Sequence, residues 1–396
     1  MVISDLGTFA LGLLALLLAG AAMRRIPVLA RMNIPVPVIA GVTVAIFVGL
    51  LQRFAGVSVQ FSAQLTDFFL LVFFTTVGLS AKFSALRAGG KPLLILCVVT
   101  VLLLVVQNAV GIAIATAFDA HPFYGVLVGS VSFVGGPGTA AAWAKEAQAA
   151  GLQHAPEIAV GAATLAVVVG AIVSGPVTDW LIRRKNLRGP TGDSPASWVA
   201  PGKNSVSAPT IPMVMLVLLL IVTSVLAGAL VNQWARAMGL MLPGFLTAML
   251  AGAAITNIGD AIGAKLDLVA VERGGEIALQ AFLVMYLMSL KLWALTAAFT
   301  PLVVNVALQV VITVMVGIVI LFRWLGKDYD AAVTMGGFLG FGLSSMPVAM
   351  ATMDSVASRH GPSPKAFLLI ALAGSFFVDL ANAFVIKAFL SLPWLR

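Results

Sequence analysis

Long apolar runs without a single charged residue constrain this chain more than any other feature of its sequence. Two of them occupy residues 92–118 and 211–233. About 20 such residues, wound into a helix, cross the hydrocarbon layer of a bilayer. Hydrophobic residues make up 61% of the 396 positions and charged residues only 10%, whereas roughly a quarter of a soluble domain is charged. The pattern predicts an all-α polytopic membrane protein and excludes a water-soluble globular domain.

The net charge of +8 has a membrane explanation. Lys and Arg total 23 against 15 Asp and Glu, and surplus basic residues in a membrane protein mark its cytoplasmic loops. No basic stripe alternates with stacking aromatic residues, which excludes a nucleic-acid partner. The lone cysteine, Cys97, cannot form an intramolecular disulfide. Because the apolar run in residues 1–25 follows an acidic start, we expect a retained first span and no cleaved signal peptide.

Hydropathy predicts ten spans, five in each half of the chain. Two further apolar segments lie between the fourth and fifth spans and between the ninth and tenth, and Gly and Pro interrupt each near its middle. These broken segments are Tyr124–Ala147 and Tyr329–Met353. The ten predicted spans are 5–23, 35–52, 66–81, 92–117, 158–182, 211–233, 242–259, 276–293, 299–322 and 366–390.

A polar stretch rich in Pro, Gly, Ser and basic residues divides the chain into halves of similar length. We interpret residues 184–208 as a flexible cytoplasmic linker. It separates an N-terminal repeat, 1–183, from a C-terminal repeat, 209–396, and each repeat contains one broken segment. The landmarks Tyr124 and Gly135 fall on Tyr329 and Gly340 at one offset, which favours internal duplication.

The basic residues predict how the repeats are oriented. If the broken segments enter the membrane and return on the same side, and both termini lie outside, most Lys and Arg residues fall on the cytoplasmic side. Each repeat then has an odd number of spans, so the two are inverted. Paired Gly- or Pro-interrupted segments at matching places indicate the binding site of a secondary transporter.

The interruptions themselves are the first candidates for a binding site. Irregular backbone at membrane depth is tolerated only where it is buried or lines a wet cavity. Glycine allows close approach to a ligand, and a helix that begins at such a loop directs free amides at a carboxylate. The alternative is that Gly and Ser only permit close helix packing. The predicted substrate-binding residues here are Gly135, Gly136, Pro137, Gly138, Thr139, Gly342, Ser344 and Ser345.

Asp379 lies midway along the tenth predicted span. A carboxylate at the bilayer centre costs at least about 2.5 kcal/mol on insertion scales and marks a functional site by default. A sodium ion would offset this cost. Asn382, three residues later on the same helix face as Asp379, is predicted to bind substrate. The alternative role for Asp379 is a structural partner of Lys387.

Three polar residues within other spans complete the candidate set. Asn108 is predicted to bind substrate, its neighbour Gln107 is a weaker candidate, and Thr164 is assigned with Asp379 to the sodium site. Such groups also form hydrogen bonds between helices without touching a ligand. The three histidines are separated in loops, and no nucleophile, base and orienting residue form a recognisable arrangement, so we predict that the protein is not an enzyme.

Ordered motifs then relate the chain to a known family. They include Ile34-Pro35-Val36-Pro37-Val38, Thr76-Val77-Gly78-Leu79, Leu86-Arg87-Ala88-Gly89-Gly90, Gln107-Asn108-Ala109-Val110-Gly111, Gly135-Gly136-Pro137-Gly138-Thr139, Leu290-Lys291-Leu292-Trp293, Gly326-Lys327-Asp328-Tyr329-Asp330-Ala331-Ala332, Gly340-Phe341-Gly342-Leu343 and Asp379-Leu380-Ala381-Asn382-Ala383. Across nearly its whole length the chain resembles the bacterial glutamate:sodium symporters. It departs from the family at Pro137, where members often carry His.

The resemblance implies a fold, a function and partners. The implied fold has two inverted repeats of five spans, each with a re-entrant hairpin, and a substrate domain that moves as an elevator against the scaffold of a homodimer. The implied function is uptake of L-glutamate with Na⁺ as the co-transported ion, through the bacterial inner membrane. The alternative is a symporter of another amino acid or of a di- or tricarboxylate, including one coupled to protons.

Overall fold

The computed structural model describes residues 2–25, 35–84, 89–187, 189, 210–238, 242–263, 268–291 and 299–392. Most of the predicted linker 184–208 lies outside these residues. The chain divides into two compact units, and each unit combines segments from both halves of the sequence. Unit 1 comprises Met1–Ser84, Ala144–Glu146 and Ala208–Thr296, and unit 2 comprises Ala85–Trp143, Ala147–Ser207 and Ala297–Arg396.

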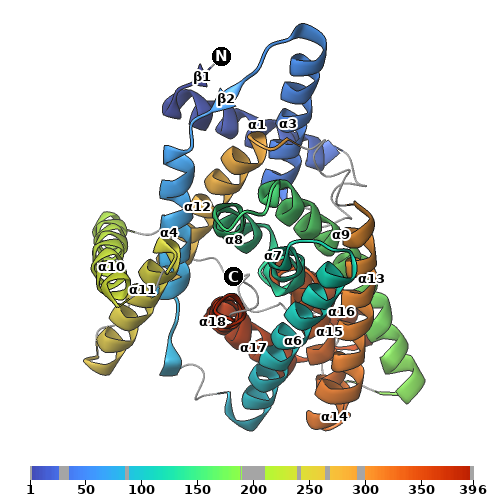
Figure 1. The fold of residues 1–396 in the computed structure, drawn as a ribbon. Helices are drawn as coiled ribbons and strands as arrows, with labels where there is room; N and C mark the ends of the chain where they lie inside the picture. Colours follow the sequence, from blue (N-terminus) through green and yellow to red (C-terminus); the bar gives the residue numbers. More distant parts are fainter. Residues whose placement is uncertain are drawn as a thin grey trace. The chain divides into compact units, whose positions relative to one another are not determined.

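Unit 1 is a helical bundle with one short pair of parallel strands. Helix α4 packs against α10, α11 and α12, and α12 also packs against α1 and α3 (Figure 1). The elements are β1 (Val2–Ile3), α1 (Asp5–Arg25), α3 (Val36–Ala55), β2 (Gln60–Phe61), α4 (Gln64–Leu79), α10 (Ile211–Ala237), α11 (Gly244–Ala261) and α12 (Leu268–Met288).

Unit 2 is built around a helix that is buried on every side. This helix, α15, packs against α9, α16 and α17, while α6 contacts α7, the π-helical segment η1 and α18. The elements of unit 2 are α6 (Gly90–Ala117), α7 (Pro122–Val126), η1 (Leu127–Val131), α8 (Gly136–Ala149, without Ala144–Glu146), α9 (Ala155–Lys185), α13 (Phe299–Met315), η4 (Val316–Leu321), α14 (Phe322–Trp324), α15 (Tyr329–Leu343), α16 (Met346–His360), α17 (Pro364–Leu372), η5 (Ala373–Phe377) and α18 (Val378–Leu390).

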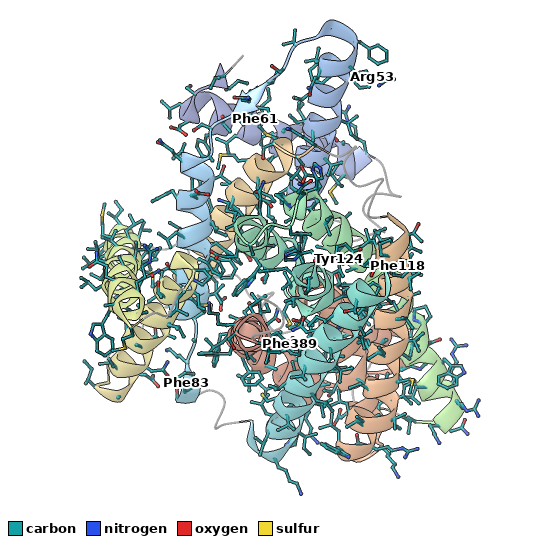
Figure 2. The ribbon with its side chains drawn as sticks, in the orientation of Figure 1. Arg53, Phe61, Phe83, Phe118, Tyr124 and Phe389 are labelled. Carbon is teal, nitrogen blue, oxygen red and sulfur yellow. The ribbon has the colours of Figure 1, made fainter. Side chains whose placement is uncertain are left out.

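Aromatic and aliphatic side chains fill the interior of unit 2. Phe338 and Phe341 project from α15 with their rings 5.4 Å apart in an edge-to-face contact. They join a cluster that includes Leu103 of α6. Tyr124 on α7 is also buried, whereas Phe118 at the end of α6 is exposed (Figure 2). A helix that is apolar all round, such as α15, needs this complete enclosure by neighbouring helices.

The surface of the bundle has the composition that lipid requires. Among the described residues, six helical stretches are long and apolar enough to cross a membrane, namely α1, α3, α6, α9, α10 and Thr300–Trp324. On α10, Leu219, Leu226 and Leu230 are more than half exposed. Such contiguous exposed apolar surface is rare on soluble monomers. The prediction of a multi-pass membrane protein is therefore confirmed.

The helices coincide closely with the predicted spans, with one clear difference. The eighth span was predicted at 276–293, but α12 begins earlier, at Leu268, and ends at Met288. Its first turns contain Glu272, Arg273 and Glu276, which lower the hydropathy without breaking the helix. Hydropathy detects the part of a helix that crosses lipid, and backbone hydrogen bonding continues beyond it.

Candidate functional site

Both broken segments form a pair of helices separated by a short non-helical tip. In the first, η1 and a short continuation lead to Val134 and Gly135, after which α8 begins. In the second, α15 stops at Leu343 and α16 begins at Met346. Helices α15 and α16 have 15 residues each and α8 has 14, which correspond to about 22 Å at 1.5 Å per residue. Each is shorter than the roughly 30 Å hydrocarbon layer.

The two tips lie against each other within unit 2. Gly136, at the start of α8, has a φ of +65°, a conformation that glycine adopts without steric cost. A Cβ atom at Gly136 would come within 3.2 Å of the carbonyl oxygen of Ser344. The predicted residues of the two tips, far apart in sequence, therefore meet in the structure.

The second tip exposes the start of a helix that no side chain caps. Ser345, at the N-cap position of α16, is extended, and its hydroxyl makes no capping hydrogen bond within the described structure. The Ser345 and Ser344 hydroxyl oxygens lie 3.4 Å apart. Free amides at a helix start, together with the helix dipole, favour an anion. A carboxylate is the ligand that this tip suits best.

A second feature of the site is a buried hydrogen-bond network centred on η1. The Ser130 hydroxyl lies 3.1 Å from Oδ1 of Asn108 and 2.6 Å from Oδ1 of Asn382. The Ser130 amide donates to Asn108 Oδ1 at 3.0 Å, and Asn382 Nδ2 donates to the Ser130 carbonyl at 3.2 Å. Gly129, just before Ser130, has non-helical backbone angles. The two predicted asparagines are thus joined through a distorted turn.

Glutamine and asparagine side chains from α6 and α13 extend the polar interior. Gln107 Nε2 donates to the carbonyl of Gly342 at 2.8 Å, two residues before the second tip. Gln309 Nε2 donates to the Gln107 carbonyl at 2.8 Å, and Asn305 Nδ2 donates to the Val128 carbonyl at 2.5 Å. These bonds connect α6 and α13 to both broken segments.

Several buried polar atoms in this region have no hydrogen-bond partner among the described residues. They are Gln107 Oε1, Asn108 Nδ2, Thr164 Oγ1 and Gln309 Oε1. Leaving one such group unsatisfied costs about 1–3 kcal/mol. Buried polar groups in native proteins nearly always bond to protein or to ordered water. Their concentration in the elements around the tips indicates an interior that receives a polar ligand or water.

Asp379 lies in the first turn of α18, immediately after the π-helical segment η5. It is partly buried and takes part in no ion pair within the part of the chain that the structure describes. Its helix contacts α6, α7 and η1. Asn382, three residues later, reaches Ser130, so the helix face shared with Asp379 is directed toward the network.

Thr164 occupies a different helix from the other sodium candidate. Helix α9 contacts η1, α13, α15 and α16. The element that α9 and α18 have in common is η1, and the sodium assignment of Thr164 stays a prediction. Gly138 and Thr139 lie in the first turn of α8 after Pro137, and the Thr139 side chain is buried.

Three residues of the network are not among the predicted site residues. Ser130 lies within the first broken segment, and Asn305 and Gln309 lie on α13. A signal was present, because Asn305, Gln309 and Thr313 recur every four residues and therefore share one helix face.

Comparison with known proteins places the chain in a family. The family model described as sodium/glutamate symporter matches residues 1–362. The chain is 39% identical over 392 residues to the sodium/glutamate symporter of Haemophilus influenzae, covering 96% of this chain and 95% of the relative. The chain belongs to the sodium/glutamate symporter family. It is also 35% identical over 394 residues to the sodium/glutamate symporter of Escherichia coli, with 99% and 98% of the two chains covered.

Membership of the sodium/glutamate symporter family confirms the resemblance that the motifs indicated. A symporter moves solutes across a membrane, so the prediction that the chain is not an enzyme is confirmed by the family. Among solved structures, a sodium proton antiporter of Methanocaldococcus jannaschii aligns with 97% of this chain and 96% of its own, at 12% identity and a TM-score of 0.39. That score does not establish a shared fold.

Proposed function

We propose that this symporter takes up L-glutamate together with Na⁺ through the bacterial cytoplasmic membrane, by alternating access. The family and its similar relatives, all named for sodium and glutamate, support this function. The observation that carries it is the uncapped start of α16 at the tip of the second broken segment, beside buried polar atoms that have no partner in the described structure.

Glutamate has the charges that these surroundings would accept. Its carboxylates would bind the amides at the starts of α8 and α16, with the hydroxyls of Thr139, Ser344 and Ser345 as further donors. Its ammonium group needs acceptors, and the side-chain oxygen of Gln107 is buried without a donor among the described residues. Pro137 fits the first turn of α8, where its missing amide hydrogen is not needed.

Asp379 is the residue that we propose for sodium coupling. A carboxylate in a membrane-spanning helix is costly unless a cation accompanies it. Sodium prefers oxygen ligands, and the π-helical turn before Asp379 disturbs the regular bonding of main-chain carbonyls. Each net positive charge that moves inward gains about 2.3 kcal/mol per 100 mV. Uptake with an excess of sodium charge is therefore electrogenic.

We further propose the finer architecture of an inverted-repeat transporter. Helices α8, α15 and α16 of the two broken segments are too short to cross the membrane, which supports re-entrant hairpins. One hairpin would lie in each repeat of five spans, 1–183 and 209–396. Unit 2 holds both tips and would be the moving domain of an elevator, and unit 1 would be the scaffold of a homodimer. Both termini would lie in the periplasm, in agreement with the positive-inside rule.

A proton-coupled carboxylate symporter is the second candidate. The observation in its favour is that Asp379 lacks an ion-pair partner among the described residues, so it could carry a proton as readily as it binds sodium. Unlabelled amino acids and di- or tricarboxylates, tested as competitors of labelled glutamate, would distinguish the substrates.

Transport in proteoliposomes tests the proposed function. We expect an inward sodium gradient to drive accumulation of labelled L-glutamate, and Asp379→Asn to abolish the sodium dependence while the protein still folds. Asp119→Asn is the matched control, because Asp119 is exposed just after α6 and its φ of +51° suits Asn equally well. Accumulation that persists without a sodium gradient would refute sodium coupling, and unchanged sodium affinity in Asp379→Asn would assign Asp379 a structural role.

A further inference from the structure

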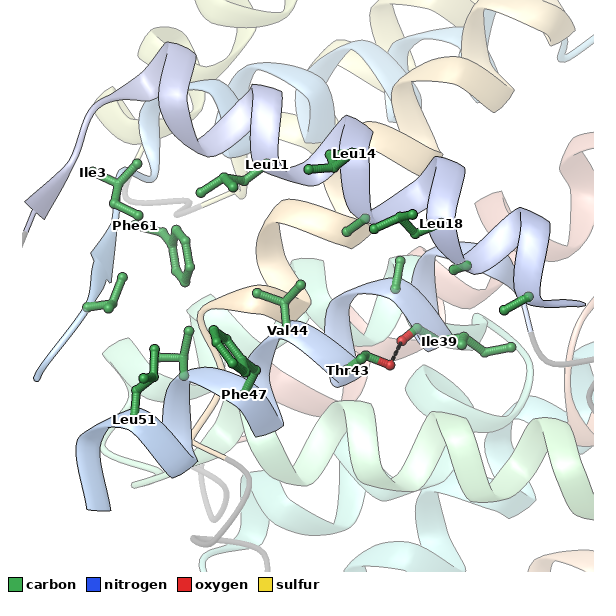
Figure 3. Close-up of a pocket in the computed structure, with 16 residues that line it drawn as sticks. Ile3, Leu11, Leu14, Leu18, Ile39, Thr43, Val44, Phe47, Leu51 and Phe61 are labelled. Carbon is green, nitrogen blue, oxygen red and sulfur yellow. Dashed lines mark hydrogen bonds between the residues drawn. The ribbon is translucent and has the colours of Figure 1, made fainter. Parts of the chain in front are cut away.

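Unit 1 contains an elongated apolar groove between α1 and α3. Its volume is about 610 Å³, and its lining includes Leu11, Leu14 and Leu18 from α1 and Val44 and Phe47 from α3 (Figure 3). Residues of the strand pair, Ile3 and Phe61 among them, line one end of the groove. Leu14, Leu18 and Phe47 line the groove and yet are more than half exposed, so the groove is open to an occupant.

The groove offers no polar partner to its occupant. Thr43 is the one polar side chain among the residues that line it, and its hydroxyl donates to the carbonyl of Ile39 at 2.7 Å (Figure 3). This bond within the helix satisfies the hydroxyl hydrogen and leaves the Thr43 methyl group as apolar surface. The groove is therefore suited to a hydrocarbon chain along its whole length.

A positive charge follows the groove-lining residues of α1. Leu11, Leu14, Leu18 and Ala22 follow one another at spacings of three or four residues, and Arg25 is the next position on the same stripe of α1. Arg25 is exposed at the end of the helix. The stripe thus changes from apolar to cationic at the point where a lipid changes from acyl chain to headgroup.

We propose that this groove binds an acyl chain of an anionic phospholipid whose headgroup phosphate contacts Arg25. From Leu11 to Ala22 the stripe rises roughly 16 Å, which matches the depth of one leaflet, about half of the 30 Å hydrocarbon layer. The apolar lining followed by a cationic residue matches an acyl chain joined to an anionic headgroup.

Lipid binding to the full-length protein tests the proposal. Delipidated protein in detergent is titrated with phosphatidylglycerol or phosphatidylethanolamine of identical acyl chains, and the bound lipid is counted by native mass spectrometry. We expect about fivefold tighter binding of the anionic lipid, since one arginine near an anionic headgroup contributes about 1 kcal/mol. Arg25→Gln should remove this preference. Thr43→Trp, which fills the groove, should weaken binding of both lipids at least tenfold.

The control is Arg53→Gln, an exposed basic residue in the last turn of α3 that does not belong to the stripe from Leu11 to Arg25 (Figure 2). It should retain the full preference for the anionic lipid. Lipid binding that Thr43→Trp leaves unchanged would overturn the proposal, as would a preference that survives Arg25→Gln. If Thr43→Trp instead separates a dimer into monomers and leaves lipid binding intact, the groove is an interface between copies. Arg25→Gln changes only an exposed residue, so the test does not depend on the folding of Thr43→Trp.

Discussion

The Ser130 hydroxyl has a single hydrogen to donate, but two side-chain amide oxygens lie close enough to accept it. It can donate to Asn382 Oδ1 at 2.6 Å or to Asn108 Oδ1 at 3.1 Å, but not to both at once. Asn108 Oδ1 also receives the Ser130 amide hydrogen, so the shorter bond to Asn382 is the one that depends on the hydroxyl. Ser130 therefore positions Asn382, which lies three residues after Asp379 on α18.

Replacing Ser130 with Ala should impair transport more than folding. The change leaves a buried acceptor on Asn382 without its donor, a loss of about 1–3 kcal/mol, and we expect glutamate uptake to fall roughly tenfold or more. Uptake at varied glutamate and sodium concentrations measures the effect. Ser132→Ala is the control, because the Ser132 hydroxyl has only main-chain carbonyls as acceptors among the described residues. Equal losses in both variants would contradict a positioning role for Ser130.

Gly136 combines a left-handed backbone with a close neighbour at the second tip. Gly136→Ala should lower the free energy of unfolding by about 1–2 kcal/mol through the backbone and also push on the Ser344 carbonyl. We expect a loss of transport larger than the loss of thermal stability explains. Gly151→Ala separates the two effects, since Gly151 has a φ of +100° and nothing within 4 Å of its Cβ position. If both variants transport equally, contact between the tips has no role.

At the scale of helices, sequence patterns predicted the spans because lipid imposes a minimum apolar length. The tips were also predictable, because Pro137 and Pro347 suit the first turn of a new helix and do not continue an old one, whereas glycine alone does not stop a helix, as α15 shows. The π-helical segments η1 and η5 were not, since their backbone bonding depends on partners such as Asn305, which donates to the Val128 carbonyl. Ser130 was not predictable for the same reason, because its role depends on hydrogen bonds to Asn108 and Asn382, which lie on other helices.

The second broken segment is held by hydrogen bonds at its base, where the start of α15 meets the residues just after α16, as well as near its tip. Tyr329, at the start of α15, donates its hydroxyl hydrogen to the Gly361 carbonyl at 2.5 Å, just beyond the end of α16. The Ser363 hydroxyl donates to Asp330 Oδ1 at 2.6 Å, and Asp328 caps α15 by accepting from the Ala331 amide. These bonds hold the two ends of the segment together, so that a rigid base supports the tip.

Tyr329→Phe should loosen this base without emptying the core. The ring remains, but the Gly361 carbonyl loses its side-chain donor, at a cost of about 1–2 kcal/mol. Hydrogen exchange should become faster at the ends of α15 and α16 and stay unchanged in α4 and α11. Ser358→Ala, which removes an exposed bond within α16, should leave exchange at the base of the segment as in the unaltered protein. Unchanged exchange in Tyr329→Phe would show that the bond contributes nothing.

At the scale of the whole molecule, the compact units do not follow the halves of the sequence. In unit 1, α12 from the second half packs against α1 and α3 from the first. In unit 2, α18 from the second half packs against α6 and η1 from the first. Each half of the chain therefore lacks packing partners that only the other half supplies.

This interleaving predicts the behaviour of a divided chain. Residues 1–195 and 196–396, expressed separately, should each be degraded, because their apolar contact faces remain unpaired. Expressed together, they should copurify and restore glutamate uptake, since the cut falls in the predicted linker. A cut within α15, after Gly337, should fail to restore uptake, because it breaks a helix at the centre of unit 2. Stable accumulation of either half alone would contradict the prediction.

The position of α18 also has a consequence for biosynthesis. The Ser130 network needs Asn382, which is synthesised 252 residues after Ser130. Until then, Asn108 and the distorted turn at Gly129 must remain in the bilayer or the insertion machinery without their final partner. A truncated or stalled chain thus presents unpaired amides at membrane depth, a defect that membrane proteases and insertion chaperones can recognise. Asn382 therefore acts as a built-in check that α18 has joined the helices made before it.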